Sequence, residues 1–279
     1  MDIKLITDSC CDLPRKLLNK IKVIPISLLV DGKSYKEGIN LTKEKYYDLL
    51  QNAKEFPGSS APSPYDYLKE LKNESNIFIL TVSSSLSSSY NNAIIAKNTF
   101  LEKYSQQKDT FIHVFDSLNA SIGQGLLLLK LQELISENLP EEEIINKMDK
   151  YINQTNTFFI LEKLDNLINS GRINRIVGKI ISTLNVKLIM GKTNKGEIKV
   201  YKKVRGSKRT FNRLIKMIGQ KGSDLDKKIL GIAHYNCLDK ALKLKKEVSL
   251  KYPFKDIIIT KMGPTISTYA DEGALLISF

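Results

Sequence analysis

Short apolar runs alternate with amphipathic stretches along the first half of the chain. The runs are KLIT (4–7), IFILTV (77–82) and FIHVF (111–115). Each has the length of a buried strand and leads into a segment with helical spacing. The pattern predicts one helix over 90–104 and another that ends near Asn138. After the first run, Asp8, Ser9 or Asp12 is expected to cap a further helix. Alternating strands and helices are typical of a parallel sheet covered by helices.

The second half of the chain predicts a different order of elements. A strand (FFIL, near 157) precedes helices within 162–184, a hairpin (NVKLIM, then GEIKVYKKV) and a helix from Ser207. The remaining elements are strand KILGIAHY, a helix over 238–250, strand DIIIT and strand ALLISF. The hairpin indicates a mixed sheet. We place a domain boundary in the polar stretch NQTNT, which divides the chain into 1–155 and 156–279.

Hydroxyl side chains concentrate where the predicted strands end. The clearest case is TVSSSLSSSYNNA (81–93), and a second polar stretch is FPGSSAPSP (56–64). In a parallel sheet the carboxyl ends of the strands meet at one edge, where ligands usually bind. Serine hydroxyls and the N–H groups of a helix start are suited to holding an anion. The alternative is an ordinary polar loop with spare helix-capping serines.

Length and composition place the chain among ordinary globular proteins. It has 279 residues, of which 42% are hydrophobic and 26% charged, so disorder and fibrous repeats are excluded. A charge-free stretch over 75–96 could span a bilayer by length, but six of the seven residues 83–89 are serine, which is too polar. The N-terminal residues lack the features of a secretory signal. We expect a cytoplasmic protein.

Positive charge is concentrated in one segment. Residues 169–221 hold 15 Lys or Arg and the single acid Glu197, whereas the rest of the chain is about neutral. Such a segment suits an acidic protein, an anionic membrane surface or a phosphorylated ligand, or it is simply a solvated face. No zinc-finger, RRM or KH pattern accompanies it, so nucleic acid is not expected as a partner and stays only as an alternative.

Catalytic and metal-ligating candidates are sparse. His113 lies within an apolar strand, where a core role is expected, and His234 ends another strand. The sequence contains no GxSxG, GxxxxGK[ST], GxGxxG or HExxH motif. Cys10, Cys11 and Cys237 form neither a disulfide framework nor a CxxC spacing, and reduced structural thiols are expected. The sequence therefore favours a binding protein with no catalytic residue, no metal and no cofactor. The alternative is an enzyme acting on a small carboxylate or phosphate in the same crevice.

Taken in order, these segments resemble the DegV family of bacterial lipid-binding proteins. ITDSCCDLP (6–14) is similar to the family's ITDSTADLP, GSSAPSP (58–64) to its TSQPSP loop, and LSSSYNNA (86–93) to its LSGTYQSA. The other similar segments are VIPISLLVDGKSYKEG, FDSLNASIGQG, LINSGRIN, LNVKLI and VRGSKR. Each motif alone is weakly specific, whereas eight in the same order over the whole chain are highly specific.

The resemblance implies two α/β domains, the first with a mostly parallel sheet and the second with a mixed sheet, and a long-chain fatty acid in an apolar tunnel between them. It implies that hydroxyl groups of the two polar turns and of a C-terminal residue bind the carboxylate. The matching positions are Ser59, Ser60, Ser87, Ser88 and Tyr269. In family members that serve a fatty acid kinase, a separate ATP-dependent subunit phosphorylates the bound acid for phospholipid synthesis.

Other positions near this expected site either match the family or depart from it. Arg172 and Arg205 match family arginines, which implies a role beside the carboxylate or in partner docking, with a plain surface role as the alternative. Tyr269 stands where the family commonly has His, so kinase coupling is less firmly implied than lipid binding. Asp271 and Glu272 replace Gly and Pro, and would disfavour an anion if they pointed inward.

Overall fold

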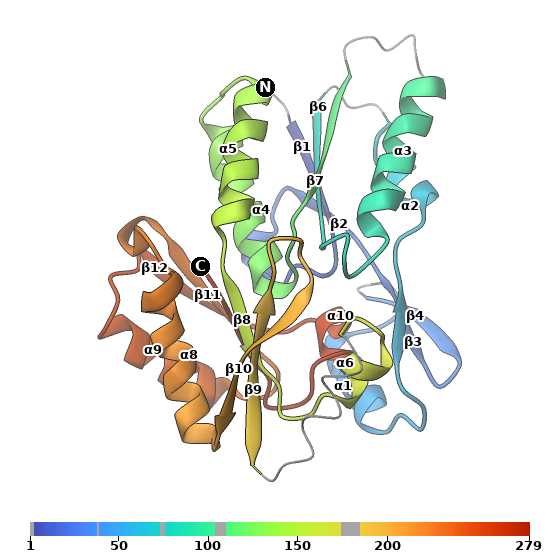
Figure 1. The fold of residues 1–279 in the computed structure, drawn as a ribbon. Coiled ribbons are helices and arrows are strands. Elements are labelled where there is room, and N and C mark those ends of the chain that lie inside the picture. The colour runs from blue at the N-terminus through green and yellow to red at the C-terminus, as the bar shows by residue number, and fades with distance from the viewer. Residues whose placement is uncertain (1–2, 38, 73–75, 104–109, 174–184) are drawn as a thin grey trace.

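A four-stranded parallel sheet organises the N-terminal half of the protein (Figure 1). The computed structural model describes residues 3–37, 39–72, 76–103, 110–173 and 185–279. The strand order is β2-β1-β6-β7. The strands are β1 (Ile3–Asp8), β2 (Ile21–Ile24), β6 (Asn76–Thr81) and β7 (Phe111–Asp116). The three apolar runs therefore form β1, β6 and β7 as predicted, because strands buried on both faces read as continuous apolar sequence.

Helices cover both faces of this sheet. The short α2 (Pro64–Leu68) and α3 (Ser89–Lys103) lie on one face, and α4 (Ser121–Ser136) and α5 (Glu141–Gln154) on the other (Figure 1). The predictions for α3 and α4 are confirmed. The prediction of a capped helix directly after β1 is wrong, since only a 3-10 turn (Arg15–Leu17) forms there and its N-cap residue makes no side-chain bond.

A small antiparallel sheet, absent from the sequence predictions, extends from the N-terminal half. Its strand order is β4-β3-β5, formed by β3 (Ser27–Val30), β4 (Lys33–Lys36) and β5 (Gly58–Ser60). Helix α1 (Lys43–Gln51) follows β4 and packs against the C-terminal half. There the Tyr46 hydroxyl lies 2.6 Å from the Thr268 hydroxyl, and the Tyr47 hydroxyl donates to the Met262 carbonyl at 2.5 Å.

The C-terminal half forms a six-stranded mixed sheet with the order β10-β9-β8-β13-β11-β12. Its strands are β8 (Thr157–Ile160), β9 (Val186–Lys192), β10 (Ile198–Arg205), β11 (Ile229–His234), β12 (Asp256–Lys261) and β13 (Leu275–Ser278). Among its described pairings, β11 and β12 run parallel and the others antiparallel. These strands, including the hairpin, were predicted from the sequence.

Helices α8 (Ser207–Lys221) and α9 (Leu238–Ser249) pack on this sheet, also as predicted. The short helices α6 (Asp165–Asn169) and α10 (Pro264–Ser267) lie in connecting segments, and a second 3-10 turn spans Leu225–Lys227. Of the helices expected within 162–184, α6 is observed, whereas residues 174–184 lie outside the described part of the chain. No helix in the described ranges is both long and apolar enough to cross a membrane.

Helix α4 joins the two halves, because it contacts β6 as well as β11 and β13. Its first half is buried on all sides, and every residue from Ser121 to Leu128 is buried. The close packing requires a glycine on the facing strand: a Cβ on Gly231 would lie 2.3 Å from a side-chain carbon of Ile122. The main apolar core therefore runs continuously from the parallel sheet through α4 to the mixed sheet.

Candidate functional site

An apolar cavity lies beside the carboxyl ends of β1, β6 and β7. Both halves of the chain contribute to its wall. The apolar lining includes Ile26, Leu86, Leu118, Phe159, Leu161 and Leu276.

Four of the residues singled out in the sequence line this one cavity: Ser59, Ser87, Arg172 and Tyr269. The hydroxyl groups of Ser59 and Tyr269 lie 2.6 Å apart, although the two residues are 210 positions apart in the chain. The guanidinium carbon of Arg172 lies 4.5 Å from the centre of the Tyr269 ring, in a cation–π contact. These groups place hydrogen-bond donors and the positive charge of Arg172 together on a largely apolar wall.

Neighbouring groups hold Arg172 and Tyr269 in defined states. Arg172 Nε donates to the Leu86 carbonyl at 3.2 Å, and Nη1 donates to the Ser170 carbonyl at 3.3 Å. Burial raises the pKa of Tyr269, whereas the bond to Ser59 and the charge of Arg172 act in the opposite direction. The phenol is therefore neutral at pH 7 and keeps its proton for hydrogen bonding.

Ser87 lies in the loop between β6 and α3, which we call the serine loop (residues 82–88). Its hydroxyl oxygen accepts a bond from the backbone N–H of Ser89 at 3.2 Å and lies 3.1 Å from the Ser89 hydroxyl. Ser89 begins α3, so Ser87 satisfies an otherwise free N–H group of that helix. The capping role and a place in the cavity wall are thus combined in one residue.

Buried side chains of the opening motif fix the loops around the cavity. Asp8 accepts from the N–H groups of Cys10 and Val82 at 3.0 and 2.8 Å, which joins the ends of β1 and β6. Ser9 accepts from the Ile26 N–H at 2.9 Å, and its hydroxyl lies 3.2 Å from that of Thr265. Asp8 and Ser9, which were expected to cap a helix, therefore hold the loops around the cavity together instead.

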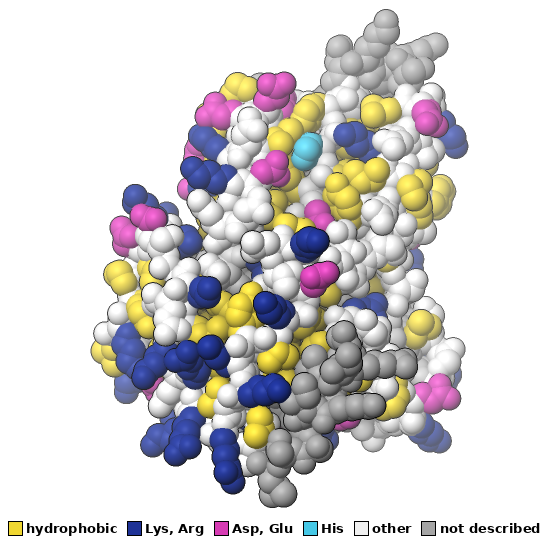
Figure 2. Space-filling view, in the orientation of Figure 1, with side chains coloured by type: hydrophobic (Ala, Val, Ile, Leu, Met, Phe, Trp, Pro, Cys, Tyr) yellow, Lys and Arg dark blue, Asp and Glu magenta, His cyan; other side chains and the backbone are white. Residues whose placement is uncertain are grey.

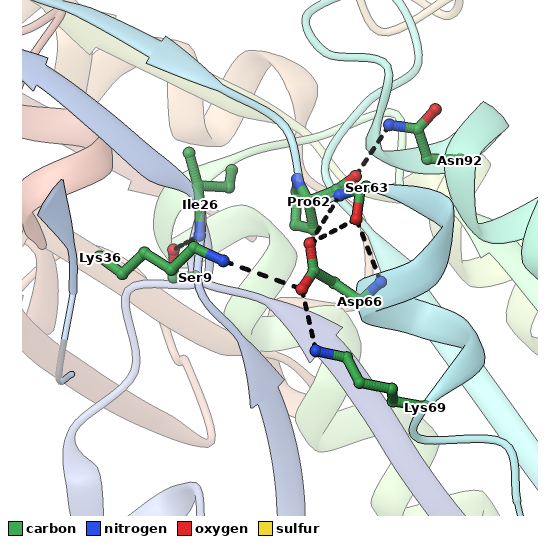
Figure 3. Close-up of polar contacts among 8 residues, drawn as sticks. All are labelled: Ser9, Ile26, Lys36, Pro62, Ser63, Asp66, Lys69 and Asn92. Carbon is green, nitrogen blue, oxygen red and sulfur yellow. Dashed lines mark hydrogen bonds and ion pairs between the residues drawn. The ribbon is translucent and has the colours of Figure 1, made fainter. Parts of the chain in front are cut away.

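The segment that leads from β5, the strand of Ser59, into α2 is anchored by Asp66 (Figure 3). Ser63 and Asp66 form a capping box at the start of α2, in which Asp66 accepts from the N–H and hydroxyl groups of Ser63. Asn92 of α3 donates to the Pro62 carbonyl at 2.8 Å. Asp66 also lies within ion-pair distance of Lys36 and Lys69, which together with its bonds to Ser63 lowers its pKa.

Several predicted site residues lie away from the cavity lining. Ser60 and Ser88 are exposed neighbours of Ser59 and Ser87, and neither lines the cavity. Arg205 is exposed at the end of β10. Asp271 and Glu272 do not line the cavity either, so the inward orientation that would disfavour an anion is not observed.

Polar residues that the motifs did not indicate also line the cavity, namely Thr157, Lys192, Glu197 and Thr265. The Lys192 ammonium group donates to the Ile152 carbonyl at 3.1 Å, near the end of α5, and burial lowers its pKa to about 8. His113 and His234 are absent from this lining. Within the described ranges, no three His, Cys, Asp or Glu residues are placed to hold a metal ion.

A basic face, which we define by the exposed cations of β10 and α8, lies outside the cavity. Figure 2 shows Lys and Arg side chains gathered over α8 and the β9–β10 hairpin. None of these cations forms an ion pair with another described residue. The basic face comprises Lys199, Lys202, Lys203, Arg205, Lys208, Arg209, Lys216 and Lys221.

Comparison with known proteins covers the whole chain. The family model described as "Uncharacterised protein, DegV family" matches residues 2–279. The chain belongs to the DegV family. A DegV domain-containing protein of Streptococcus pneumoniae is 32% identical over 287 residues, which cover 100% of this chain and 99% of that protein. The family resemblance inferred from the ordered motifs is thereby confirmed.

Solved structures of DegV proteins share the fold and carry fatty acids. A Ruminococcus gnavus DegV protein with vaccenic acid matches with a TM-score of 0.93 and 28% identity, over 100% of this chain and 99% of that one. The fatty acid kinase B3 protein of Streptococcus pneumoniae, loaded with linoleic acid, matches with a TM-score of 0.89 and 30% identity over the same shares. The predicted DegV fold, parallel sheet first and mixed sheet second, is confirmed.

Proposed function

We propose that this protein is a cytoplasmic carrier that binds one long-chain fatty acid in the cavity between domains 1–155 and 156–279. The observation that carries the proposal is the composition of the cavity wall, which is apolar except for a few polar groups such as Ser59, Ser87, Tyr269 and Arg172. The wall suits an alkyl chain, and the polar cluster suits its carboxylate. The fatty acids present in related DegV structures support the same conclusion.

The energetics assign different roles to the chain and the carboxylate. Burying ten methylene groups is worth about 8 kcal/mol before the costs of association are subtracted. Hydrogen bonds to a charged group contribute about 1.5–3 kcal/mol each. The alkyl chain therefore supplies most of the affinity, while Ser59, Ser87 and Tyr269 determine which end of the ligand lies beside them. A small carboxylate or phosphate would leave the apolar wall unused, which disfavours the enzyme alternative.

The carboxylate is presented, we infer, to the ATP-dependent catalytic subunit of a fatty acid kinase. The match to the Streptococcus pneumoniae fatty acid kinase B3 protein supports this partner. The partner subunit then catalyses phosphorylation of the fatty acid carboxylate, and this chain is the non-catalytic subunit. The exposed charges of the basic face suit an acidic surface of the kinase, or transient contact with an anionic membrane.

Native mass spectrometry of the purified protein, followed by denaturing extraction, tests the carrier proposal. A co-purifying fatty acid is expected, and its mass gives the chain length. The proposal fails if the protein is empty and also takes up no added fatty acid.

Ser87→Ala tests the orientation of the ligand. Loss of one charge-assisted hydrogen bond is expected to raise the Kd for a fatty acid about 10- to 100-fold. Displacement of a fluorescent fatty acid measures the Kd. Ser88→Ala is the matched control, because Ser88 is exposed beside Ser87 and does not line the cavity. Equal fatty acid affinities of the two variants would show that Ser87 does not bind the carboxylate.

A further inference from the structure

The turn of the β9–β10 hairpin forms part of the cavity wall. Strands β9 and β10 come from the mixed sheet, and β10 is an edge strand that pairs with β9 alone in that sheet. From this hairpin Lys192, Gly196, Glu197 and Ile198 line the cavity. In Figure 1 the hairpin reaches toward the carboxyl ends of β6 and β7. One wall of the cavity is therefore the tip of an edge hairpin.

Two serines of the serine loop hold this turn. The Ser83 hydroxyl donates to the Gly196 carbonyl at 3.0 Å, and the Ser85 hydroxyl donates to the Lys195 carbonyl at 2.6 Å. Both bonds connect the N-terminal half to the C-terminal half beside the cavity. A hydroxyl–carbonyl bond contributes only about 0.5–1.5 kcal/mol net, so each is strong enough to favour the closed position and weak enough to break often.

Gly196 is suited to this contact in two ways. Its φ of +76° lies in the left-handed region, which residues other than glycine rarely adopt. A Cβ at this position would lie 2.1 Å from the Ser83 hydroxyl oxygen and 2.9 Å from the Leu118 Cα. The turn therefore reaches the serine loop closely only because residue 196 has no side chain.

We propose that the β9–β10 turn is a latch on the acyl cavity, held closed by Ser83 and Ser85, and that fatty acids enter and leave when it releases. This inference rests on the proposed carrier function. The serines that hold the latch belong to the same short loop as Ser87, and Ser83 is four residues before Ser87. Contact of a carboxylate with Ser87 thus orders the loop that also fastens the turn.

Removal of the latch bonds tests the proposal by kinetics. Release of bound cis-parinaric acid into excess unlabelled fatty acid is followed by stopped-flow fluorescence. Ser85→Ala is expected to accelerate release about 3- to 10-fold, and Ser83→Ala with Ser85→Ala about 10- to 100-fold. Uptake accelerates as well, so the Kd changes less than either rate. Ser84→Ala is the matched control, because Ser84 is exposed and makes no side-chain bond to the turn.

A disulfide across the latch gives the opposite test, and it holds even if Ser83→Ala is poorly folded. The second latch bond suits a cross-link, because neither of its residues has a positive φ and the Ser85 hydroxyl lies 2.6 Å from the Lys195 carbonyl oxygen. Ser85→Cys with Lys195→Cys places two thiols at this contact, and thiol titration verifies that the disulfide forms. Oxidised protein is expected to exchange fatty acid at least about tenfold more slowly than the same protein after reduction.

Two outcomes separate failure of the latch from failure of the carrier function. Equal exchange rates in the oxidised and reduced double-cysteine protein would overturn the latch while leaving the carrier function intact. Failure of the wild-type protein to take up cis-parinaric acid would overturn the carrier function itself. Wild-type protein treated with the same oxidant is the control for Cys10, Cys11 and Cys237.

Discussion

The Tyr269 side chain joins two parts of the polar cluster. Its hydroxyl contacts Ser59, and its ring supports the Arg172 guanidinium. Tyr269→Phe removes the first contact and keeps the second. We expect fatty acid affinity to fall about 3- to 10-fold, the size of one hydrogen bond, as measured by fluorescent fatty acid displacement. Tyr65→Phe is the control, since Tyr65 is 66% exposed and lies outside the cavity lining. Equal effects of both changes would contradict a role for the Tyr269 hydroxyl.

Asp12 and Glu37 make stability depend on pH. Both carboxyl groups border Gly263, whose N–H donates to Asp12 at 2.7 Å, and Lys43 lies 3.7 Å from Glu37. Burial raises the pKa of Asp12 to about 6 and that of Glu37 to about 7. Between about pH 4 and 7 these two groups therefore bind more protons in the folded protein than in the unfolded chain, and their contribution to the free energy of unfolding falls as pH rises.

Urea unfolding at pH 5 and pH 7.5 measures this pH effect. The decrease in unfolding free energy between the two values is expected to shrink in Asp12→Asn combined with Glu37→Gln, because neither replacement titrates. Glu44→Gln, at an exposed position of α1, provides a control for the loss of one acid. A pH dependence identical to wild type in the double variant would show that other groups cause the effect.

At the scale of elements, the sequence predicts the strands formed by continuous apolar runs and misses the short polar strands β4 and β5. The runs that form β6 and β7 are continuous and buried, so their pattern is sufficient. In contrast, β4 and β5 read KSYK and GSS, and they form because β3 pairs with both of them. The contact between Ser59 and Tyr269 depends on this pairing and on the packing of distant segments. The local sequence pattern gives no signal for this contact, whereas the family motifs pointed to both residues.

The edge of the mixed sheet offers a test of partner docking. Arg205 ends β10 on the basic face and lies outside the cavity lining. Arg205→Glu is therefore expected to leave the fatty acid Kd unchanged and to slow acyl-phosphate formation by a fatty acid kinase subunit supplied with ATP. Lys45→Glu makes the same charge change at an exposed position of α1, which lies apart from α8 and β10 (Figure 1), and should react normally. Acyl-phosphate formation at the wild-type rate would rule out docking through Arg205, and sedimentation with anionic vesicles tests the membrane alternative.

At the scale of the whole molecule, the cavity lies where the two halves meet, so a ligand contacts both of them. Val82 and Leu86 face it from the serine loop, and Ile266 and Ala270 face it from the segment around α10. Buried apolar contacts to both sides stabilise their association. A fatty acid at a free concentration of 100 times its Kd should therefore raise the free energy of unfolding by about 2.7 kcal/mol.

Hydrogen exchange locates this stabilisation. Binding is expected to slow amide exchange in residues 82–89 and in residues 262–270 together, because the ligand restrains both walls and local opening must now break ligand contacts. Acetate supplies the carboxylate without the alkyl chain and should protect neither segment at the same concentration. Protection confined to one of the two segments would show that the ligand rests on one half of the molecule, and a carrier site between the halves would then be wrong.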